Sequence, residues 1–369
     1  MKEVLYLSFD SLKEGVGASQ VLAYMRKVLL FTKVTIISFE KDMPSESEIH
    51  EVEIDGLKWI PLPFGNFGIL GGVNRVFRMW MRIDRSKIVH ARSTLPGLAA
   101  MLRFPTSWVW DCRSLQADQR RALSANQSVN FVFLTMRVIE YVLAKKSSAI
   151  IVITNAVVPV FVSRFGIPNN KICVISTCVD VRKFQEKPFK ESGDIKILFA
   201  GTFSPAYDVD LINKIIERLR RHHSVRVTIA TSPGSTDLWK GIAYNNVISV
   251  HHSQMPKLIQ EHDLGISIWK NDLGICLTSV ASTKTAEFLA CGRPVIINSL
   301  QGDFGNLIKD NIAGVVTSSG GEPELQDYAK QIVRLVQDDA TPNRCRQLAL
   351  QKFDLDKGVN VLINLYQKL

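Results

Sequence analysis

Lys284 and Glu287 are two charged residues whose spacing suits a ligand-binding site. They lie in the segment 279–303, which reads SVASTKTAEFLACGRPVIINSLQGD. A separation of three positions places both side chains on one face of a helix, near the N-terminus that we predict for it. A lysine there, together with free backbone N–H groups, can hold a phosphate, and the carboxylate can accept hydrogen bonds from sugar hydroxyls. The same pair can also be an exposed ion pair worth a few tenths of a kcal/mol, so the spacing alone leaves both interpretations open.

The residues that follow this pair predict the end of the helix, a tight turn and a buried strand. Gly292 can end the helix because glycine enters the left-handed conformation at little steric cost. Residues 295–297 are Val, Ile and Ile, an apolar β-branched run that is typical of a buried strand in a parallel sheet. We therefore expect the Lys284–Glu287 helix to be anchored on a sheet.

The segment AEFLACGRPVI resembles the donor-site helix of family 4 glycosyltransferases, which have the GT-B fold. That family usually carries two glutamates eight positions apart; the second matches Glu287, but the first position holds Ser279. A sub-group has a lysine three residues before the glutamate, and Lys284 matches it. The resemblance extends over nearly the whole chain, through the segments VLYLSFDSL, GASQVLAYM, IVHARS, WDCRSLQAD, AIIVIT, KICVISTCVD, ILFAGTF and LIKDNIAGVV.

The resemblance implies a retaining transferase that uses a nucleotide-diphosphate sugar and needs no metal or other cofactor. Lys284 would neutralise the leaving diphosphate, because the chain has no cation between Gly201 and Asp210. Glu287 would hold the ribose. The donor-site residues expected on this basis are Gly201, Thr202, His251, Met255, Ser279, Lys284 and Glu287.

Polar residues also end two strands that we predict in the first half of the chain, at His90-Ala91-Arg92 and at Asp111-Cys112-Arg113. Open α/β sheets bind ligands at the carboxyl ends of their strands. The resembled family often has a catalytic histidine where this chain has Asp111. We expect His90 and Asp111 to be catalytic and Arg92 and Arg113 to line the acceptor cleft; for each residue alone, a structural salt bridge is the alternative.

A glycine-containing loop follows the first predicted strand, residues 4–9, and precedes a predicted helix at residues 18–31. Gly15 and Gly17 in this loop can let the backbone approach a ligand, here the acceptor, or can form an ordinary short turn. The sequence GVGAS does not match GxGxxG, and no P-loop signature is present, so neither a dinucleotide nor ATP is favoured.

The composition indicates a two-domain α/β protein without a disulfide framework. The chain has 369 residues, of which 46% are hydrophobic, and a formal net charge of +10. A positive charge favours acidic partners such as a nucleotide diphosphate or an anionic membrane, but no recognised nucleic-acid-binding signature is present. The six cysteines form no CxxC pair, which argues against zinc. The chain starts directly with a predicted strand, so we expect no signal peptide and a cytoplasmic protein, peripheral on the inner face of the membrane.

Alternating strands and helices predict two Rossmann-like domains that face each other across a cleft, as in the GT-B fold. We expect an acceptor-binding domain at residues 1–178, a linker at 179–194 and a nucleotide-sugar-binding domain at 195–354. A C-terminal helix at 355–369 would cross back to the first domain, as the resemblance implies.

Two segments have the character of helices that can lie on a membrane. In residues 71–86, Val76, Trp80 and Ile83 share one side, while four arginines including Arg75 form a basic stripe on another. Residues 130–146 show the same mixture of apolar and basic side chains. Each segment can bind anionic lipid or simply pack as a surface helix.

These observations together predict a retaining glycosyltransferase that moves a sugar from a nucleotide sugar to a lipid-linked saccharide or polysaccharide, as in capsule, O-antigen or exopolysaccharide synthesis. The alternatives are a non-hydrolysing nucleotide-sugar epimerase, which would need no acceptor, and an inactive GT-B protein that only binds. A two-lobed solute-binding protein and a nucleic-acid binder are less well supported by the residues.

Overall fold

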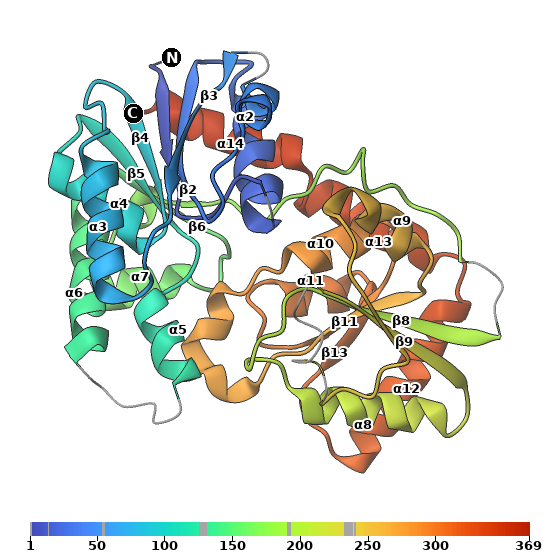
Figure 1. Ribbon diagram of the computed structural model, residues 1–369. Coiled ribbons are helices and arrows are strands. Elements are labelled where there is room, and N and C mark those ends of the chain that lie inside the picture. The colour runs from blue at the N-terminus through green and yellow to red at the C-terminus, as the bar shows by residue number, and fades with distance from the viewer. Residues whose placement is uncertain are drawn as a thin grey trace. The chain divides into compact units, whose positions relative to one another are not determined.

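The computed structural model describes residues 2–13, 15–53, 56–124, 131–189, 193–231, 239 and 241–369. The chain forms two compact units, shown in Figure 1. Unit 1 comprises Met1–Ser176 and Leu355–Leu369, and unit 2 comprises Thr177–Asp354. Each unit has its own parallel sheet and its own hydrophobic core.

The sheet of unit 1 has seven strands in the order β3-β2-β1-β4-β5-β6-β7, and neighbouring strands are parallel throughout. Its strands are β1 Val4–Leu7, β2 Val34–Glu40, β3 Lys58–Pro63, β4 Ile88–Arg92, β5 Ser107–Cys112, β6 Ala149–Val152 and β7 Ile172–Val174. β1, β2, β4, β5 and β6 are buried along their whole length, as expected for strands covered on both faces.

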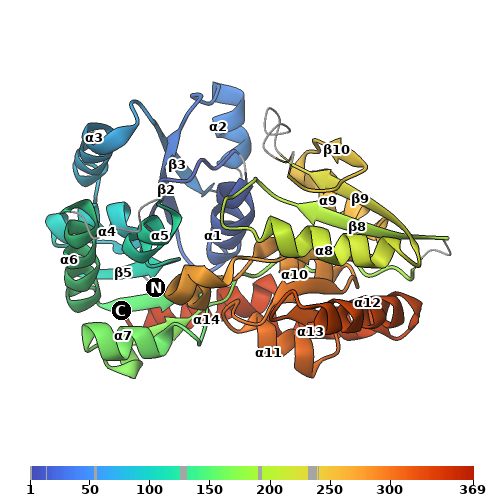
Figure 2. The same ribbon diagram turned by 90° about the horizontal axis from the view of Figure 1, so that it is seen from below.

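Helices cover this sheet, and α3, α4 and α6 pack side by side in that order. Figure 2 shows these three helices along one side of unit 1. α1 packs on the C-terminal helix α14, which belongs to unit 1. The helices of unit 1 are η1 Gly17–Leu22, α1 Ala23–Val28, α2 Glu46–Val52, α3 Gly68–Trp80, α4 Thr94–Arg103, α5 Gln116–Leu123, α6 Phe131–Lys146, α7 Val158–Phe165, η3 Asn169–Lys171 and α14 Leu355–Gln367.

The sheet of unit 2 has six parallel strands in the order β10-β9-β8-β11-β12-β13. They are β8 Asp194–Ala200, β9 Ser224–Ala230, β10 Asn246–Ile248, β11 Leu264–Ser267, β12 Val295–Asn298 and β13 Gly314–Thr317. The helices are α8 Val209–Arg220, η5 His252–Gln254, α9 Met255–Gln260, η6 Asn271–Ser279, α10 Thr283–Ala290, α11 Phe304–Asp310, α12 Glu322–Gln337 and α13 Thr341–Lys352.

The predicted fold class is confirmed, since both units alternate strands and helices around a parallel sheet. The segment 179–194, which we expected to be a linker, differs in its packing. Val179, Val181 and Phe184 are buried in the core of unit 2, because this segment runs over α10 and α13 rather than through solvent. Residues 190–192 of the segment lie outside the described residues.

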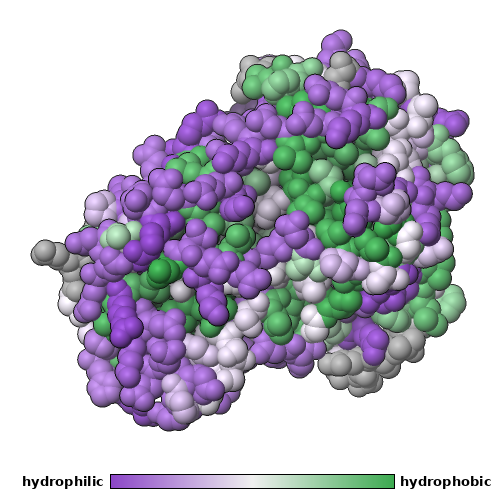
Figure 3. All heavy atoms as spheres, turned by 180° about the vertical axis from the view of Figure 1, so that it is seen from behind, coloured by the Kyte–Doolittle hydropathy of each residue, from purple (hydrophilic) through white to green (hydrophobic). Residues whose placement is uncertain are grey.

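The surfaces of the two units differ in hydropathy. On the face shown in Figure 3, hydrophilic side chains cover most of unit 2, whereas hydrophobic side chains reach the surface in broader patches over unit 1. None of the described helices combines the length and the apolar character needed to cross a membrane.

Candidate functional site

α10 carries the two charged residues that the sequence indicated, and its first turn is held by a cap. The Ser282 hydroxyl accepts a hydrogen bond from the Thr285 N–H at 3.4 Å, which satisfies one free donor of the helix N-terminus. Gly292 follows the helix with a φ of 74°, and the chain then enters β12, as predicted. The helix is therefore fixed at both ends.

Lys284 and Glu287 form an ion pair, with 2.8 Å between the lysine Nζ and Glu287 Oε2. Glu287 is 1% exposed, while about a quarter of the Lys284 side chain is accessible. The other carboxylate oxygen of Glu287 lies 3.3 Å from His252 Nε2. Burial alone would raise the pKa of Glu287, but Lys284 and His252 outweigh it and lower the pKa, so the carboxylate is ionised.

A small pocket beside α10 brings this helix to the end of two strands. Its volume is about 210 Å³, and Ala200, Ser267, Lys284 and Thr285 are among the residues that line it. The strands β8 and β11 are neighbours, so their carboxyl ends meet at the N-terminus of α10. Gly265 allows this close approach, because a Cβ there would lie 2.6 Å from the ring of Phe288 on α10.

The other expected donor-site residues lie in two places. Gly201 directly follows β8 with a φ of 145°, and its N–H donates to the Ala230 carbonyl; the exposed Thr202 comes next. Ser279 is buried at the end of η6. Gly201 is thus close to the pocket that Lys284 lines.

The side chains of His251 and Met255 have partners other than the Lys284–Glu287 pair. The exposed His251 caps η5, with its Nδ1 2.9 Å from Ser253 Oγ. Met255 is buried in the core of unit 2, which leaves little of its side chain for stacking on a base. The residue that contacts Glu287 is instead His252, which sequence reasoning missed; the His251-His252 doublet was the available signal.

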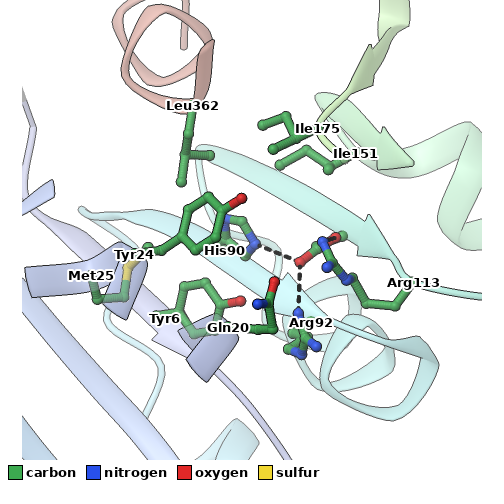
Figure 4. A pocket seen from close by; sticks show the side chains of 11 residues that line it. Tyr6, Gln20, Tyr24, Met25, His90, Arg92, Arg113, Ile151, Ile175 and Leu362 are labelled. Carbon is green, nitrogen blue, oxygen red and sulfur yellow. Dashed lines mark hydrogen bonds and ion pairs between the residues drawn. The ribbon is translucent and has the colours of Figure 1, made fainter. Parts of the chain in front are cut away.

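Unit 1 contains a second polar cluster, at the carboxyl ends of β4 and β5. Arg92 and Asp111 are directly opposite each other in the pairing of these strands. The side chains of His90, Arg92 and Arg113, which Figure 4 labels, all contact the carboxylate of Asp111. The distances to the Asp111 oxygens are 3.3 Å from His90 Nε2, 3.6 Å from Arg92 Nη1 and 3.5 Å from Arg113 Nη1. The structure therefore brings all four predicted residues together.

Buried charges in this cluster are balanced by their neighbours. Burial would raise the pKa of Asp111, but Arg113, His90 and Arg92 together lower it well below the usual range. Burial alone would lower the pKa of Arg92, but Tyr6, Asp111 and Asp10 together outweigh burial and raise the pKa above its usual value. The guanidinium therefore stays charged. Burial also lowers the pKa of His90 despite the hydrogen bond to Asp111, so the imidazole is neutral near pH 7.

The cluster opens into a pocket of about 280 Å³ in unit 1. Figure 4 shows that its walls come from β1, the first helices, β4 and α14. Sequence reasoning missed most of these wall residues because they are apolar or aromatic and widely separated along the chain. The lining comprises Tyr6, Gln20, Tyr24, Met25, His90, Arg92, Asp111, Arg113, Ile151, Ile175 and Leu362.

Gly15 precedes η1 and Gly17 is its first residue; η1 contributes Gln20 to the pocket. A Cβ at Gly17 would lie 1.7 Å from the Ser11 carbonyl oxygen, so only glycine fits there. Gly15 has a φ of 54° and open space around it. The buried Glu40 holds the same loop, because its carboxylate accepts hydrogen bonds from the Leu12 N–H at 3.0 Å and from Ser11.

The described residues contain no group of three or more His, Cys, Asp and Glu side chains that could hold a metal ion. Neither polar cluster therefore offers a metal site within the part of the chain that the structure covers. What both clusters offer is fixed charge: a partly exposed cation at a helix N-terminus in unit 2, and two arginines around one carboxylate in unit 1.

Two α/β units of this kind, one with a lysine–glutamate helix beside its sheet, define the GT-B class of glycosyltransferases. Residues 17–183 match the family model for Glycosyltransferase Family 4, and residues 194–338 match the model for Glycosyl transferases group 1. The chain belongs to the GT-B glycosyltransferases and is a transferase enzyme. No sequence among the curated proteins matches it significantly.

Solved structures of low sequence identity share the fold over the whole chain. Anabaena HepE in complex with UDP and glucose has 14% identity and a TM-score of 0.72, with 100% of both chains covered. Sucrose-phosphate synthase from Thermosynechococcus elongatus has 13% identity and a TM-score of 0.72, covering 100% of this chain and 99% of that one. WaaG, a glycosyltransferase involved in lipopolysaccharide biosynthesis, has 12% identity and a TM-score of 0.66, covering 97% and 99%.

Proposed function

We propose that this enzyme transfers a sugar, with retention of configuration, from a uridine-diphosphate sugar to a saccharide acceptor carried on a lipid. The observation that carries the donor half is the Lys284–Glu287–His252 cluster at the N-terminus of α10, next to a pocket at the ends of β8 and β11. The uridine base is supported by HepE, whose structure holds UDP in the same fold.

The chemistry assigned to Lys284 is electrostatic. When the bond between the anomeric carbon and the phosphate oxygen breaks, negative charge grows on the departing diphosphate. A partly exposed lysine and the free N–H groups of α10 stabilise that charge more in the transition state than in the ground state. Glu287 orients Lys284 through the ion pair at 2.8 Å and offers its carboxylate to the ribose hydroxyls.

The acceptor half is assigned to the pocket of unit 1. His90 is neutral and hydrogen-bonded to Asp111, and Arg92 and Arg113 hold that carboxylate ionised. The hydroxyl groups of a sugar suit this pocket. Paired guanidinium and carboxylate groups at the edge of the pocket can still donate and accept further hydrogen bonds. A lipid carrier is supported by the shared fold with WaaG and by the exposed apolar residues of α3 and α6 described in the next subsection.

The donor site is tested by thermal shift with UDP, GDP and ADP. At a hundredfold excess over Kd we expect UDP alone to raise the Tm by about 3 °C. Lys284→Ala and Glu287→Gln should weaken UDP binding by about tenfold or more, because each loses a charged contact or the group that orients it.

Lys214→Ala is the matched control, because Lys214 also forms a helical ion pair, with Asp210 at 2.7 Å, on the exposed side of α8. It should bind UDP as the wild type does. Equal shifts from all three nucleotides, or a UDP shift that survives in both α10 variants, would contradict the assigned donor site.

A further inference from the structure

The segment 71–86 buries the predicted apolar residues Val76 and Ile83, but it also buries Arg75, one of the four arginines of the predicted basic stripe. Arg75 is buried, and its Nη1 donates to the Phe64 and Asn66 carbonyls at 3.0 and 2.8 Å. Its guanidinium also lies over the ring of Phe64, 4.0 Å from the ring centre. The prediction that Arg75 belongs to an exposed basic stripe is therefore wrong, because backbone carbonyls and an aromatic ring satisfy it inside unit 1.

The outward side of α3 is apolar instead. Leu70, Val73 and Phe77 recur at helical spacing and are 85%, 62% and 52% exposed. The exposed apolar residues of this strip and its immediate neighbours are Phe67, Ile69, Leu70, Val73, Phe77, Met81, Leu102 and Phe104. Scattered exposed apolar residues are normal, but a continuous strip along one helix marks an interaction surface.

α6 presents a second strip of the same kind. Phe131, Leu134, Val138 and Tyr141 are spaced three and four positions apart and are all exposed, Phe131 to 83%. α4 packs between α3 and α6, so the two strips belong to one helical layer, which Figures 1 and 2 show along one side of unit 1. We call these two strips together the α3–α6 surface.

The charges around this surface are almost all positive. Residues 67–146 contain four acidic residues, of which Asp111, Asp118 and Glu140 are buried, leaving Asp84 exposed. The exposed cations of the same stretch are Arg82, Arg85, Arg120, Arg121, Lys145 and Lys146. Apolar side chains between cations match the interface of an anionic bilayer, in which acyl chains lie beneath negative headgroups.

The N-terminal ends of both strips lie at the carboxyl edge of the sheet of unit 1. In a parallel α/β unit, helices begin at the edge where strands end, so Leu70 and Phe131 lie at the edge that carries His90 and Asp111. Exposure is greatest at this end, at Leu70 and Phe131. The pocket itself faces α1 and α14 on the other side of the sheet, so a bilayer on these strips would share with the pocket only this carboxyl edge of the sheet.

We propose that the α3–α6 surface seats unit 1 on an anionic lipid bilayer, with its apolar strips in the interface and its cations on the headgroups. A second copy of the chain is the competing occupant, since heptad-like strips also suit helix pairing. The charges favour lipid, because pairing two copies through this surface would bring like charges together. The inference deepens the acceptor half of the proposed function.

The test is co-sedimentation of the full chain with vesicles, without donor or acceptor. Vesicles of phosphatidylcholine with phosphatidylglycerol should sediment the protein at low salt, and phosphatidylcholine alone should bind it at least about tenfold less. High salt should weaken binding, because the headgroup attraction is screened. Leu70→Ser/Phe77→Ser should lower the partition coefficient by about tenfold or more, and Arg82→Gln/Lys146→Gln should reduce the salt dependence.

Leu30→Ser/Phe31→Ser is the matched control, because Leu30 and Phe31 are 81% and 54% exposed but lie after α1, outside the α3–α6 surface. It should bind vesicles as the wild type does. Absence of binding to anionic vesicles would overturn the proposal, as would an equal loss of binding in Leu70→Ser/Phe77→Ser and in the control Leu30→Ser/Phe31→Ser. So would a dimer in sedimentation velocity that Leu70→Ser/Phe77→Ser converts to a monomer.

The donor half is judged separately. Each vesicle-binding variant should keep the UDP-induced thermal shift, and Lys284→Ala should keep vesicle binding. If the wild type does not bind UDP, the donor site is rejected and the vesicle result still stands. If the wild type does not bind anionic vesicles, the α3–α6 proposal is rejected and the UDP result still stands.

Discussion

His90 is held in one tautomer by partners on both ring nitrogens. Its Nε2 faces the ionised Asp111, so Nε2 carries the proton and donates it. Its Nδ1 lies 2.6 Å from the Tyr366 hydroxyl on α14, which must therefore donate. The ring also stacks on Tyr6, with 4.3 Å between ring centres. The proton of His90 thus has a defined position at the carboxylate that lines the pocket.

Tyr366→Phe should disturb this arrangement without removing the aromatic ring. The variant leaves His90 Nδ1 buried without its donor, which costs about 1–2 kcal/mol of unfolding free energy. Because the lost hydrogen bond favoured the neutral imidazole, the pKa of His90 should also rise. Urea denaturation measures the first effect, and NMR titration of the imidazole measures the second. An unchanged titration of His90 would show that Tyr366 only packs there.

Glu140 is a buried acid of α6 that makes stability depend on pH. Its carboxylate accepts a hydrogen bond from the Ala117 N–H at 3.0 Å, yet burial raises its pKa to about 7. The folded state therefore binds the proton more tightly than the unfolded chain does. Its stabilising contribution is complete below the unfolded pKa and is lost as pH rises towards about 7.

Glu140→Gln should remove this loss, because the amide stays neutral and can still accept from Ala117. The unfolding free energy of the variant minus that of the wild type should increase by about 2 kcal/mol from about pH 5 to about pH 8. Denaturation curves at both pH values measure the difference. Parallel pH profiles of the two proteins would show that Glu140 is not the responsible group.

At the scale of elements, the turn between β1 and η1 depends on two glycines for different reasons. Gly17→Ala would place a methyl group 1.7 Å from the Ser11 carbonyl oxygen, which forces the backbone to move. Gly15→Ala meets no atom within 4 Å and only strains a positive φ. We expect a cost of about 1 kcal/mol for Gly15→Ala and at least about twice that for Gly17→Ala.

Chemical denaturation measures both variants, and near-UV circular dichroism reports on Tyr6 and Tyr24 beside the loop. The expected order is wild type, Gly15→Ala, Gly17→Ala, from most to least stable. Equal stability of the two variants would mean that the loop moves without cost, and that the close approach at Gly17 is not required.

Periodicity predicted the elements well where burial alone decides the pattern. The run at residues 295–297 forms β12, and the helix predicted at 18–31 is found as η1 Gly17–Leu22 followed by α1 Ala23–Val28. It failed for α3, because a pattern of charges does not reveal that Arg75 finds backbone carbonyls inside the fold. The sequence likewise could not place His252 on Glu287 or Tyr366 on His90, since these contacts join distant segments.

At the scale of the whole molecule, each unit contributes one half of the proposed reaction. Unit 2 carries α10 with Lys284, the helix proposed to bind the diphosphate, and unit 1 carries the His90–Asp111 pocket and the α3–α6 surface. The C-terminal helix α14 belongs to unit 1, where Tyr366 contacts His90. The pocket proposed for the acceptor is lined by residues from both sequence ends of unit 1, Tyr6 and Leu362, although the family models end at residue 338.

The enzyme is proposed to move a sugar from a uridine-diphosphate donor to an acceptor on a lipid. The most direct measurement is UDP release from a panel of UDP-sugars, with and without lipid-linked saccharides in anionic vesicles. We expect release with one donor sugar, dependent on the acceptor and lowered at least about tenfold in Lys284→Ala. Acceptor-independent formation of an epimerised UDP-sugar, or no reaction with any UDP-sugar, would contradict the claim.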